Sequence, residues 1–158
     1  MEDGGMRKFL ASFVFSGLAL VSLTGCEKYR LDAEVRELCA KDGGIKVYEK
    51  VTLPPEKFDQ YGNIRIPTKK DAKPSDEYYY DDEDTYFRKG DPYDGPNMWR
   101  SHTKVVRRSD GKVLGESIRY TRVGGDIPGP WHPSHFSCYD MDIPMDLEKS
   151  IFTERSEK

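Results

Sequence analysis

The chain has 158 residues, of which 36% are hydrophobic and 34% are charged, and its formal net charge is −3 at pH 7. This length predicts a single domain, and the near balance of acidic and basic residues excludes the polybasic surface of a typical nucleic-acid-binding protein. The longest apolar run lies in residues 1–25, and no later run is long enough to span a membrane. We therefore expect residues 26–158 to form one small, polar domain with a thin core.

Residues 1–25 have the pattern of a secretory signal peptide. A short basic stretch, residues 6–8, precedes the uncharged and mainly apolar stretch Phe9–Leu23. An apolar stretch of this length is typical of a signal peptide that is removed, and it is short for a transmembrane helix. Acidic residues precede Met6, where an export signal usually has positive charge, so we expect Met6 to be the native start.

The predicted signal peptide is followed by a cysteine. Residues 23–26, with the sequence LTGC, resemble the lipobox of bacterial lipoproteins. This resemblance implies cleavage before Cys26 and attachment of acyl chains, palmitate among them, to its thiol and its new amino group. Three acyl chains would hold the domain durably on a membrane. The alternative is an ordinary secretory signal that ends at a cysteine by chance.

The residue after Cys26 bears on location. It is Glu27, whereas the lipoproteins that the lipobox resembles carry Asp there as their usual signal for retention in the inner membrane. The resemblance therefore implies a lipid-anchored protein in the bacterial cell envelope, on the outer membrane and facing the periplasm.

Two further cysteines remain once Cys26 carries lipid. Cys39 and Cys138 are an even pair in a chain that we expect in an oxidising compartment, which predicts a disulfide between them. The bond would close a loop of about 100 residues and would join the first element of the domain to one of the last.

The first part of the domain contains one helical pattern and two strand patterns. Apolar residues recur at helical spacing over residues 31–42, with Cys39 on the apolar face, and Gly43 and Gly44 then predict the end of the helix. Alternating apolar and polar residues predict a half-buried strand over residues 45–53 and a shorter strand within residues 60–67.

Residues 71–98 differ from both flanks in composition. They contain nine acidic and three basic residues and half of the ten tyrosines, with three prolines and no sustained periodicity. This composition predicts a long acidic, tyrosine-rich surface loop. Tyrosine offers a large contact area at low entropic cost, so Tyr78, Tyr79 and Tyr80 are candidates for a recognition surface. The acids lack the spacing of an EF-hand calcium loop.

A β-hairpin is predicted over residues 103–123, with its turn at residues 109–111. A three-residue loop with Gly111 in the left-handed conformation gives better cross-strand pairs than a two-residue turn. These pairs are Val106 with Leu114 and Lys104 with Glu116. Ile118 and Tyr120 continue one face of the second strand, which we expect to lie against the helix.

Residues 124–138 are rich in proline and glycine, which predicts an irregular path. Three segments, residues 39–49 (CAKDGGIKVYE), 109–117 (SDGKVLGES) and 124–134 (GGDIPGPWHPS), resemble a group of small bacterial lipoproteins. The resemblance covers roughly residues 26–140 apart from the acidic segment, and it implies no activity.

The same segment carries the remaining candidate site residues. His132, His135 and Cys138 stand three residues apart, as zinc ligands could, but Cys138 has a partner in Cys39 and Pro133 prevents a helix that would align them. Trp131 is a candidate platform for stacking against a sugar ring. The possible binding surface therefore consists of Trp131, His132, His135, Tyr78, Tyr79 and Tyr80.

These patterns together predict an α+β fold, in which a short N-terminal helix packs on a small antiparallel sheet and a long acidic loop projects from it. The favoured function is a non-enzymatic envelope lipoprotein that serves as a binding or structural module for a protein or glycan partner. No catalytic residue, metal ligand or cofactor is assigned. The alternative is a small envelope hydrolase or metal-dependent enzyme that uses His132 and His135.

Overall fold

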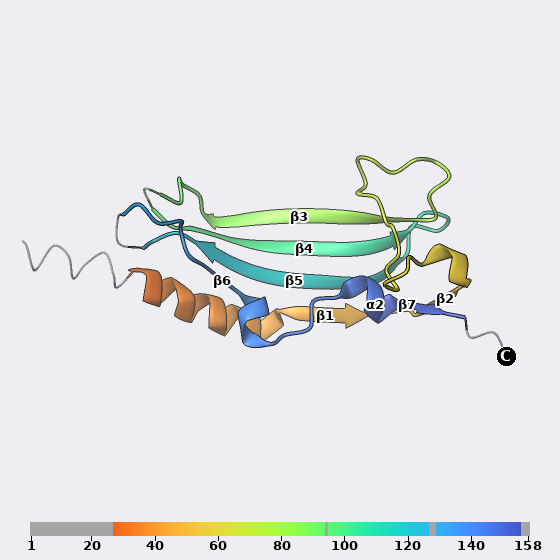
Figure 1. The fold of residues 1–158 in the computed structure, drawn as a ribbon, viewed down its shortest axis with the longest axis horizontal. Helices are drawn as coiled ribbons and strands as arrows, with labels where there is room; N and C mark the ends of the chain where they lie inside the picture. The colour runs from red at the N-terminus through yellow and green to blue at the C-terminus, as the bar shows by residue number, and fades with distance from the viewer. Residues whose placement is uncertain (1–26, 94, 127–128, 156–158) are drawn as a thin grey trace, which may run out of the picture.

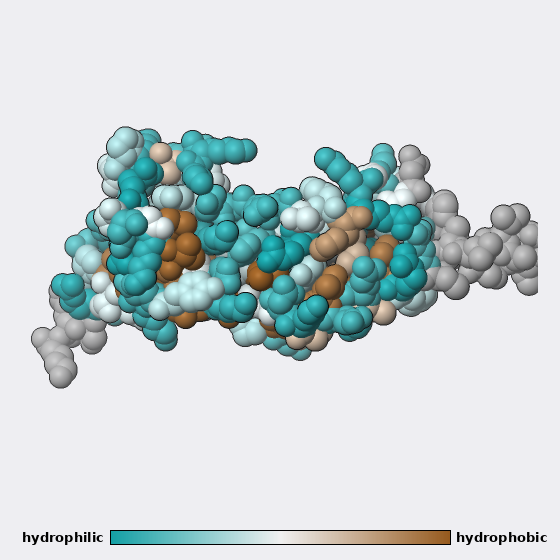
Figure 2. All heavy atoms as spheres, turned by 180° about the vertical axis from the view of Figure 1, so that it is seen from behind, coloured by the Kyte–Doolittle hydropathy of each residue, from teal (hydrophilic) through white to brown (hydrophobic). Residues whose placement is uncertain are grey.

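The computed structural model describes residues 27–93, 95–126 and 129–155, so the predicted signal peptide and Cys26 lie outside the described residues. The fold is α+β, with one long helix and a mostly antiparallel sheet (Figure 1). No helix in the described part of the chain is long and apolar enough to cross a membrane. Figure 2 shows that hydrophilic side chains cover most of one side of the molecule, with apolar atoms exposed between them in small patches.

Within the described ranges, the main sheet has five strands, and its central path runs in the order β1–β5–β4–β3 with antiparallel neighbours. These strands are β1 (Gly44–Val47), β3 (Tyr78–Arg88), β4 (Asn97–Arg107) and β5 (Val113–Val123). The fifth strand, β6 (His135–Ser137), pairs with the end of β5, whereas β1 pairs with its first half. Arg119 and Tyr120 lie between the β5 residues that pair with β1 and those that pair with β6.

The prediction of a loop over residues 71–98 is wrong for its central part, which forms β3 along β4. Residues 67–69 cover the first part of the outer edge of β3, because Tyr80 N donates to Pro67 O at 2.9 Å and Lys69 N donates to Tyr80 O at 2.8 Å. Residues 82–88 are exposed. The strand carries acids and tyrosines on both faces because one of its edges and much of both faces meet solvent, so its sequence lacks the alternation of a half-buried strand.

The strand predicted over residues 45–53 is two strands in different sheets. Its second part, β2 (Val51–Leu53), pairs in parallel with β7 (Phe152–Glu154). The break occurs where the amides of Tyr48 and Glu49 both donate to Leu114 O, at 2.8 and 2.9 Å, which ends the ladder between β1 and β5.

The strand predicted within residues 60–67 is also wrong. One isolated bridge, between Phe58 and Ile64, marks this region, which follows the short 3-10 helix η1 (Pro55–Lys57). The Asp59 carboxylate accepts hydrogen bonds from the amides of Tyr61 and Asn63 at 2.8 and 2.9 Å, and these bonds close a turn instead of a strand.

The hairpin between β4 and β5 follows the prediction except at one pair. Gly111 has a left-handed φ of 68°, and Lys104 lies opposite Glu116. Val106 lies opposite Val113, because the register shifts between Val105 and Val106. The predicted pair of Val106 with Leu114 is therefore wrong. The bulge adds one residue to β5, so the partner of Val106 moves from Leu114 to Val113.

Two hydrophobic clusters lie on opposite faces of the sheet. On one face, the helix over residues 27–42 places Leu31 and Val35 against Ile118 and Tyr120. The second cluster includes Val105, which lies opposite Gly115 and therefore on the other face. Helix α2 (Leu147–Ile151) and the β2–β7 pair contribute to this second cluster. The small core is thus divided between the two sides of one sheet.

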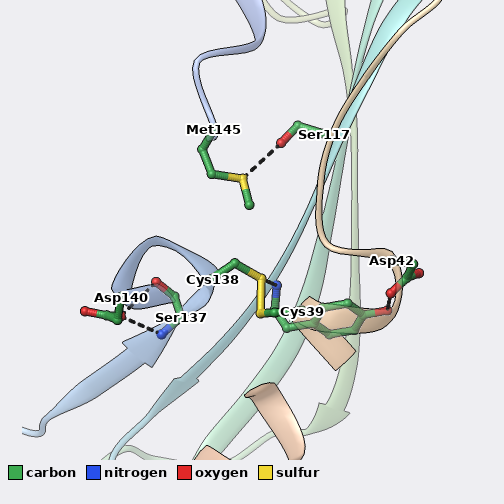
Figure 3. Close-up of a disulfide and its surroundings, with 8 residues drawn as sticks. Cys39, Asp42, Ser117, Ser137, Cys138, Asp140 and Met145 are labelled. Atoms are coloured by element: carbon green, nitrogen blue, oxygen red, sulfur yellow. Dashed lines mark hydrogen bonds between the residues drawn. A yellow bond between two sulfur atoms is a disulfide. The ribbon is translucent and has the colours of Figure 1, made fainter. Parts of the chain in front are cut away.

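A disulfide joins Cys39 in the helix to Cys138, the residue after β6 and the first of the 3-10 helix η2 (Cys138–Met141), with a Cα–Cα distance of 5.5 Å (Figure 3). Cys138 Sγ also accepts a hydrogen bond from the backbone N–H of Tyr120 at 3.3 Å, in the gap between β1 and β6. The helix must end tightly here. A Cβ atom at Gly43 would lie 2.7 Å from Cys39 O and 3.1 Å from Cys138 Sγ, so this position requires glycine.

Arg122 is 1% exposed and connects the sheet, the helix and the segment of residues 124–134. Its Nε and Nη2 atoms pair with the Asp32 carboxylate at 2.8 and 2.6 Å. Its Nη1 atom donates to Gly124 O and to the backbone oxygen and hydroxyl of Ser134, at 2.8–2.9 Å. All three guanidinium nitrogens therefore have partners, as a buried charge requires.

Asp126 extends this network to the first turn of the helix. Its carboxylate pairs with Lys28 at 2.6 Å and accepts hydrogen bonds from the amide and hydroxyl of Ser134, at 2.6 and 2.8 Å. Burial alone would raise the pKa of Asp126, but Lys28 and Ser134 together outweigh it and hold the pKa at about 2.

We expect the disulfide to supply a large share of the stability of this thin core. The bonded cysteines are 99 residues apart, and loss of a native disulfide in a small domain costs on the order of 2–5 kcal/mol. Urea unfolding with and without reductant measures the difference. In a Cys39→Ala/Cys138→Ala variant the reductant should have no effect, and finding both thiols free in the oxidised wild-type protein would contradict the prediction.

We expect Asp126 to make stability depend on pH in the acid range. Its pKa is about 2 in the folded protein, below the ordinary value of 3.8 for an aspartate side chain. The contribution is therefore present above about pH 4 and is lost as the pH falls towards 2, and it amounts to roughly 2 kcal/mol. Urea unfolding at pH 6, 4 and 2.5 should show wild-type stability falling towards that of Asp126→Asn. Parallel pH profiles for the two proteins would contradict this.

Candidate functional site

The six residues of the predicted binding surface do not form one surface. Tyr78 lies opposite Arg107 at one end of β4, whereas His135 pairs with Val123, which lies opposite Asn97 at the other end. At about 3.4 Å per residue, these ends are roughly 30 Å apart. The tyrosines of β3 and the residues around Trp131 are therefore separate features.

The three consecutive tyrosines also differ from one another. Tyr78 packs edge-on against Phe152, with ring centroids 4.9 Å apart, and borders the second cluster. Tyr79 lies beneath the Arg108 guanidinium, which is 5.4 Å from its ring centroid. Tyr80 lies opposite Val105, on the sheet face that carries α2. Successive side chains of a strand point to opposite faces, so the predicted tyrosine surface is not formed.

The histidines offer no assembled metal site in the part of the chain that the structure describes. His132 and His135 are exposed, and the sulfur of Cys138 is bonded to Cys39. No group of three His, Cys, Asp or Glu side chains among the described residues is placed to hold a metal ion. Cys138 therefore cannot serve as the third ligand that the spacing of these residues suggested.

A polar pocket of about 290 Å³ lies between the sheet and the C-terminal segment. Its sheet wall consists of side chains that alternate onto one face of β3, β4 and β5, namely Tyr80, Ser101, Thr103, Ser117 and Arg119. Its other wall comes from η2, α2 and the residues between them, namely Tyr139, Met145, Asp146, Leu147 and Glu148. Ser117 Oγ donates to Met145 Sδ at 3.4 Å, and this contact joins the two walls.

Two residues that line this pocket each have a buried polar atom with no hydrogen-bond partner among the described residues. These atoms are the Tyr80 hydroxyl and Arg119 Nε. Buried polar atoms in proteins are nearly always paired, and leaving one unpaired costs about 1–3 kcal/mol. Both atoms are hydrogen-bond donors and both residues line the same pocket. The wall of the pocket therefore contains two polar side chains whose hydrogen-bonding capacity is not used within the described chain.

Charge and protonation define the pocket further. Burial raises the pKa of Tyr80, and the Glu148 carboxylate raises it further, although no hydrogen bond between the two groups has good geometry. Tyr80 is thus a neutral donor at physiological pH. The Arg119 guanidinium lies 5.4 Å from the ring centroid of Tyr139, so the cation faces an aromatic ring. Asp146 and Glu148 give the lining one more negative than positive charge.

A second polar cluster, formed by Glu116, Tyr48 and His102, lies on the opposite face of the sheet and stabilises the fold. Glu116 accepts a hydrogen bond from Tyr48 Oη at 2.6 Å and bonds His102 Nε2 at 2.7 Å. The Tyr48 hydroxyl lowers the pKa of Glu116 against the opposing effect of burial, and His102 lowers it further. Lys46 and Lys104 lie opposite Glu116 on the neighbouring strands. These contacts stabilise the sheet and leave no unpaired buried group for a ligand.

A larger hollow of about 500 Å³ lies at the far end of the sheet, between residues 74–78 and residues 107–109. Two of its charged residues already have partners, because Arg108 Nε donates to Asp76 O at 2.8 Å and Arg107 Nη1 pairs with Glu49 at 2.8 Å. The smaller pocket remains the better candidate because both unpaired buried donors line it.

Comparisons with protein-family models, with curated proteins and with solved structures find no match to this chain. Among the pocket residues, only Tyr80 was a sequence candidate. The sequence carries one signal for this pocket, which is the alternation of polar residues along two strands. Ser101 and Thr103 of β4 and Ser117 and Arg119 of β5 lie on one face of the sheet. The apolar residues Ile118 and Tyr120 lie on the other face.

Proposed function

We propose that the protein is a bacterial envelope lipoprotein, anchored to the outer membrane through Cys26, whose domain binds a saccharide without catalysing a reaction. The signal-peptide pattern and the lipobox-like residues 23–26 support the anchor. The Cys39–Cys138 disulfide suits an oxidising compartment such as the periplasm. The observation that carries the binding role is that Tyr80 and Arg119, which each have a buried donor without a partner among the described residues, line one pocket.

A hydroxyl-rich ligand matches the chemistry of this lining. Each ligand hydroxyl can accept a hydrogen bond from Tyr80 or Arg119 and donate one to Asp146 or Glu148. The ring of Tyr139, which is 54% exposed, offers an apolar face for the C–H side of a sugar ring. The excess of negative charge disfavours an anionic ligand. At about 290 Å³ the pocket is at the lower end of the range for small-molecule sites.

Tryptophan fluorescence gives a direct test, because Trp99 Nε1 donates to the hydroxyl of the pocket residue Ser101 at 3.2 Å. In a Trp131→Phe background, Trp99 is the remaining tryptophan, since the chain has two. Titration with neutral N-acetylglucosamine oligosaccharides should give a saturable change in Trp99 emission. A flat titration with folded protein would contradict saccharide binding, and binding of a protein instead would assign the face to a protein partner.

The Tyr80→Phe variant separates binding from folding. Its hydroxyl is buried and unpaired in the structure, so its removal should leave the free energy of unfolding unchanged or slightly higher. Affinity for the saccharide should fall about tenfold, the effect of losing one hydrogen bond of about 1–1.5 kcal/mol. Tyr61→Phe, at a tyrosine that is 73% exposed and outside the pocket, is the matched control and should bind as the wild type does.

The anchor is tested by Cys26→Ser, which removes the thiol that the lipobox pattern assigns to acylation. The variant should incorporate no labelled fatty acid and should leave the membrane fraction or accumulate as an uncleaved precursor. Normal fractionation and labelling of the variant would exclude the proposed lipid anchor.

A further inference from the structure

The helix that follows the proposed lipidation site is fixed to the domain from its first described residue. Glu27 forms an ion pair with Arg88 at the end of β3, and Lys28 pairs with Asp126 at 2.6 Å. One turn later, Asp32 pairs with the buried Arg122. The described chain is helical at residue 27, and consecutive Cα atoms are about 3.8 Å apart. Cys26 is therefore attached directly to a rigid part of the domain, with no flexible linker between them.

Three other segments meet the start of the helix at the same end of the sheet. They are the end of β3 at Arg88, residues 89–93 with 95–96, and residues 124–126 with 129–134. A Cβ atom at Gly124 would lie 2.4 Å from Pro92 O, and one at Gly125 would lie 3.2 Å from the Pro96 side chain and 3.8 Å from the Lys28 Cα atom. Figure 1 shows this end of the molecule, where the described helix begins beside the ends of the long strands.

Exposed aromatic side chains occur on both sheet faces at this end, because Tyr86 packs on Trp99 with ring centroids 5.9 Å apart and Phe87 stacks on Tyr120 of the opposite face at 6.0 Å. They come from the first helical turn, the end of β3 and the two loops, and they are Tyr29 (74% exposed), Tyr86 (47%), Phe87 (53%), Tyr93 (66%) and Trp131 (52%). Large apolar or aromatic groups exposed together on a small domain mark a surface that meets another phase or another molecule. Trp and Tyr are the residues most enriched at membrane–water interfaces, because their rings are apolar and carry a polar group.

We propose that this end of the domain, which we call the aromatic end, lies in the headgroup region of the membrane that holds the lipid on Cys26. The proposal rests on the proposed function, since it requires the anchor. A lipid surface is the expected partner because the direct attachment of Cys26 to the helix leaves the domain no length of chain with which to move away from the bilayer. Arg30, which lies 3.9 Å from Glu34, and Lys89, whose Nζ lies 5.1 Å from the Tyr86 ring centroid, supply positive charge at the same end.

The test uses acylated protein reconstituted in vesicles of phosphatidylethanolamine and phosphatidylglycerol. In a Trp99→Phe variant, Trp131 is the reporter of the aromatic end. Lipids that carry a nitroxide quencher at the headgroup should quench Trp131 several-fold more strongly than lipids that carry it at the end of the acyl chain. The matched control is Tyr61→Trp in a Trp99→Phe/Trp131→Phe background. Tyr61 is 73% exposed, and it follows η1, which lies at the far end of the sheet from Arg88.

The outcomes distinguish this proposal from the anchor on which it rests. Strong shallow quenching of Trp131 and weak quenching of the control support an embedded aromatic end. Protein that binds the vesicles but shows no more quenching of Trp131 than of the control overturns the proposal and leaves the anchor intact. Acylated protein that does not remain on the vesicles overturns the anchor itself.

Discussion

The buried guanidinium of Arg122 is the contact on which the organisation of one half of the molecule depends. A single side chain of β5 holds Asp32 of the helix, the turn at Gly124 and both polar groups of Ser134. The segment of residues 124–134 has no regular structure of its own in its described part, so these hydrogen bonds and those of Asp126 determine its path. Removal of the guanidinium would leave the Asp32 carboxylate and these oxygen atoms without their partner. The resulting loss in the free energy of unfolding would be far greater than the net contribution of the ion pair itself.

The division of the core into two clusters explains why so many polar contacts of this kind are needed. Each face of the sheet buries only a few apolar side chains, such as Ile118 and Tyr120 on one face and Val105 on the other. Neither cluster alone encloses the sheet. The helix and the C-terminal segment therefore depend on specific links to β5, and the disulfide provides one such link where the ladders of β1 and β6 both stop.

Sequence patterns predicted the elements that local chemistry determines. The periodicity of Leu31 and Val35 and the turn at Gly111 follow from neighbours in the chain. β3 could not be predicted in this way, because its pairing with β4 stabilises it while its own side chains are largely exposed. The pocket was missed for a related reason. Its two unpaired donors, on Tyr80 and Arg119, are brought together by the register of three strands and by α2, and no local spacing encodes that register.

The open edge of β3 gives its acidic residues a role that composition alone did not suggest. Beyond residues 67–69, the described chain places no strand against this edge, where Asp82, Glu83 and Asp84 are exposed. An uncovered edge can pair with the same edge of another molecule, and like charges on both partners oppose such pairing. Molecules held on one membrane share a thin layer of solution and meet far more often than the same number would in bulk. On the proposed lipid anchor, the acids on β3 would therefore oppose edge-to-edge pairing between neighbouring copies of the domain.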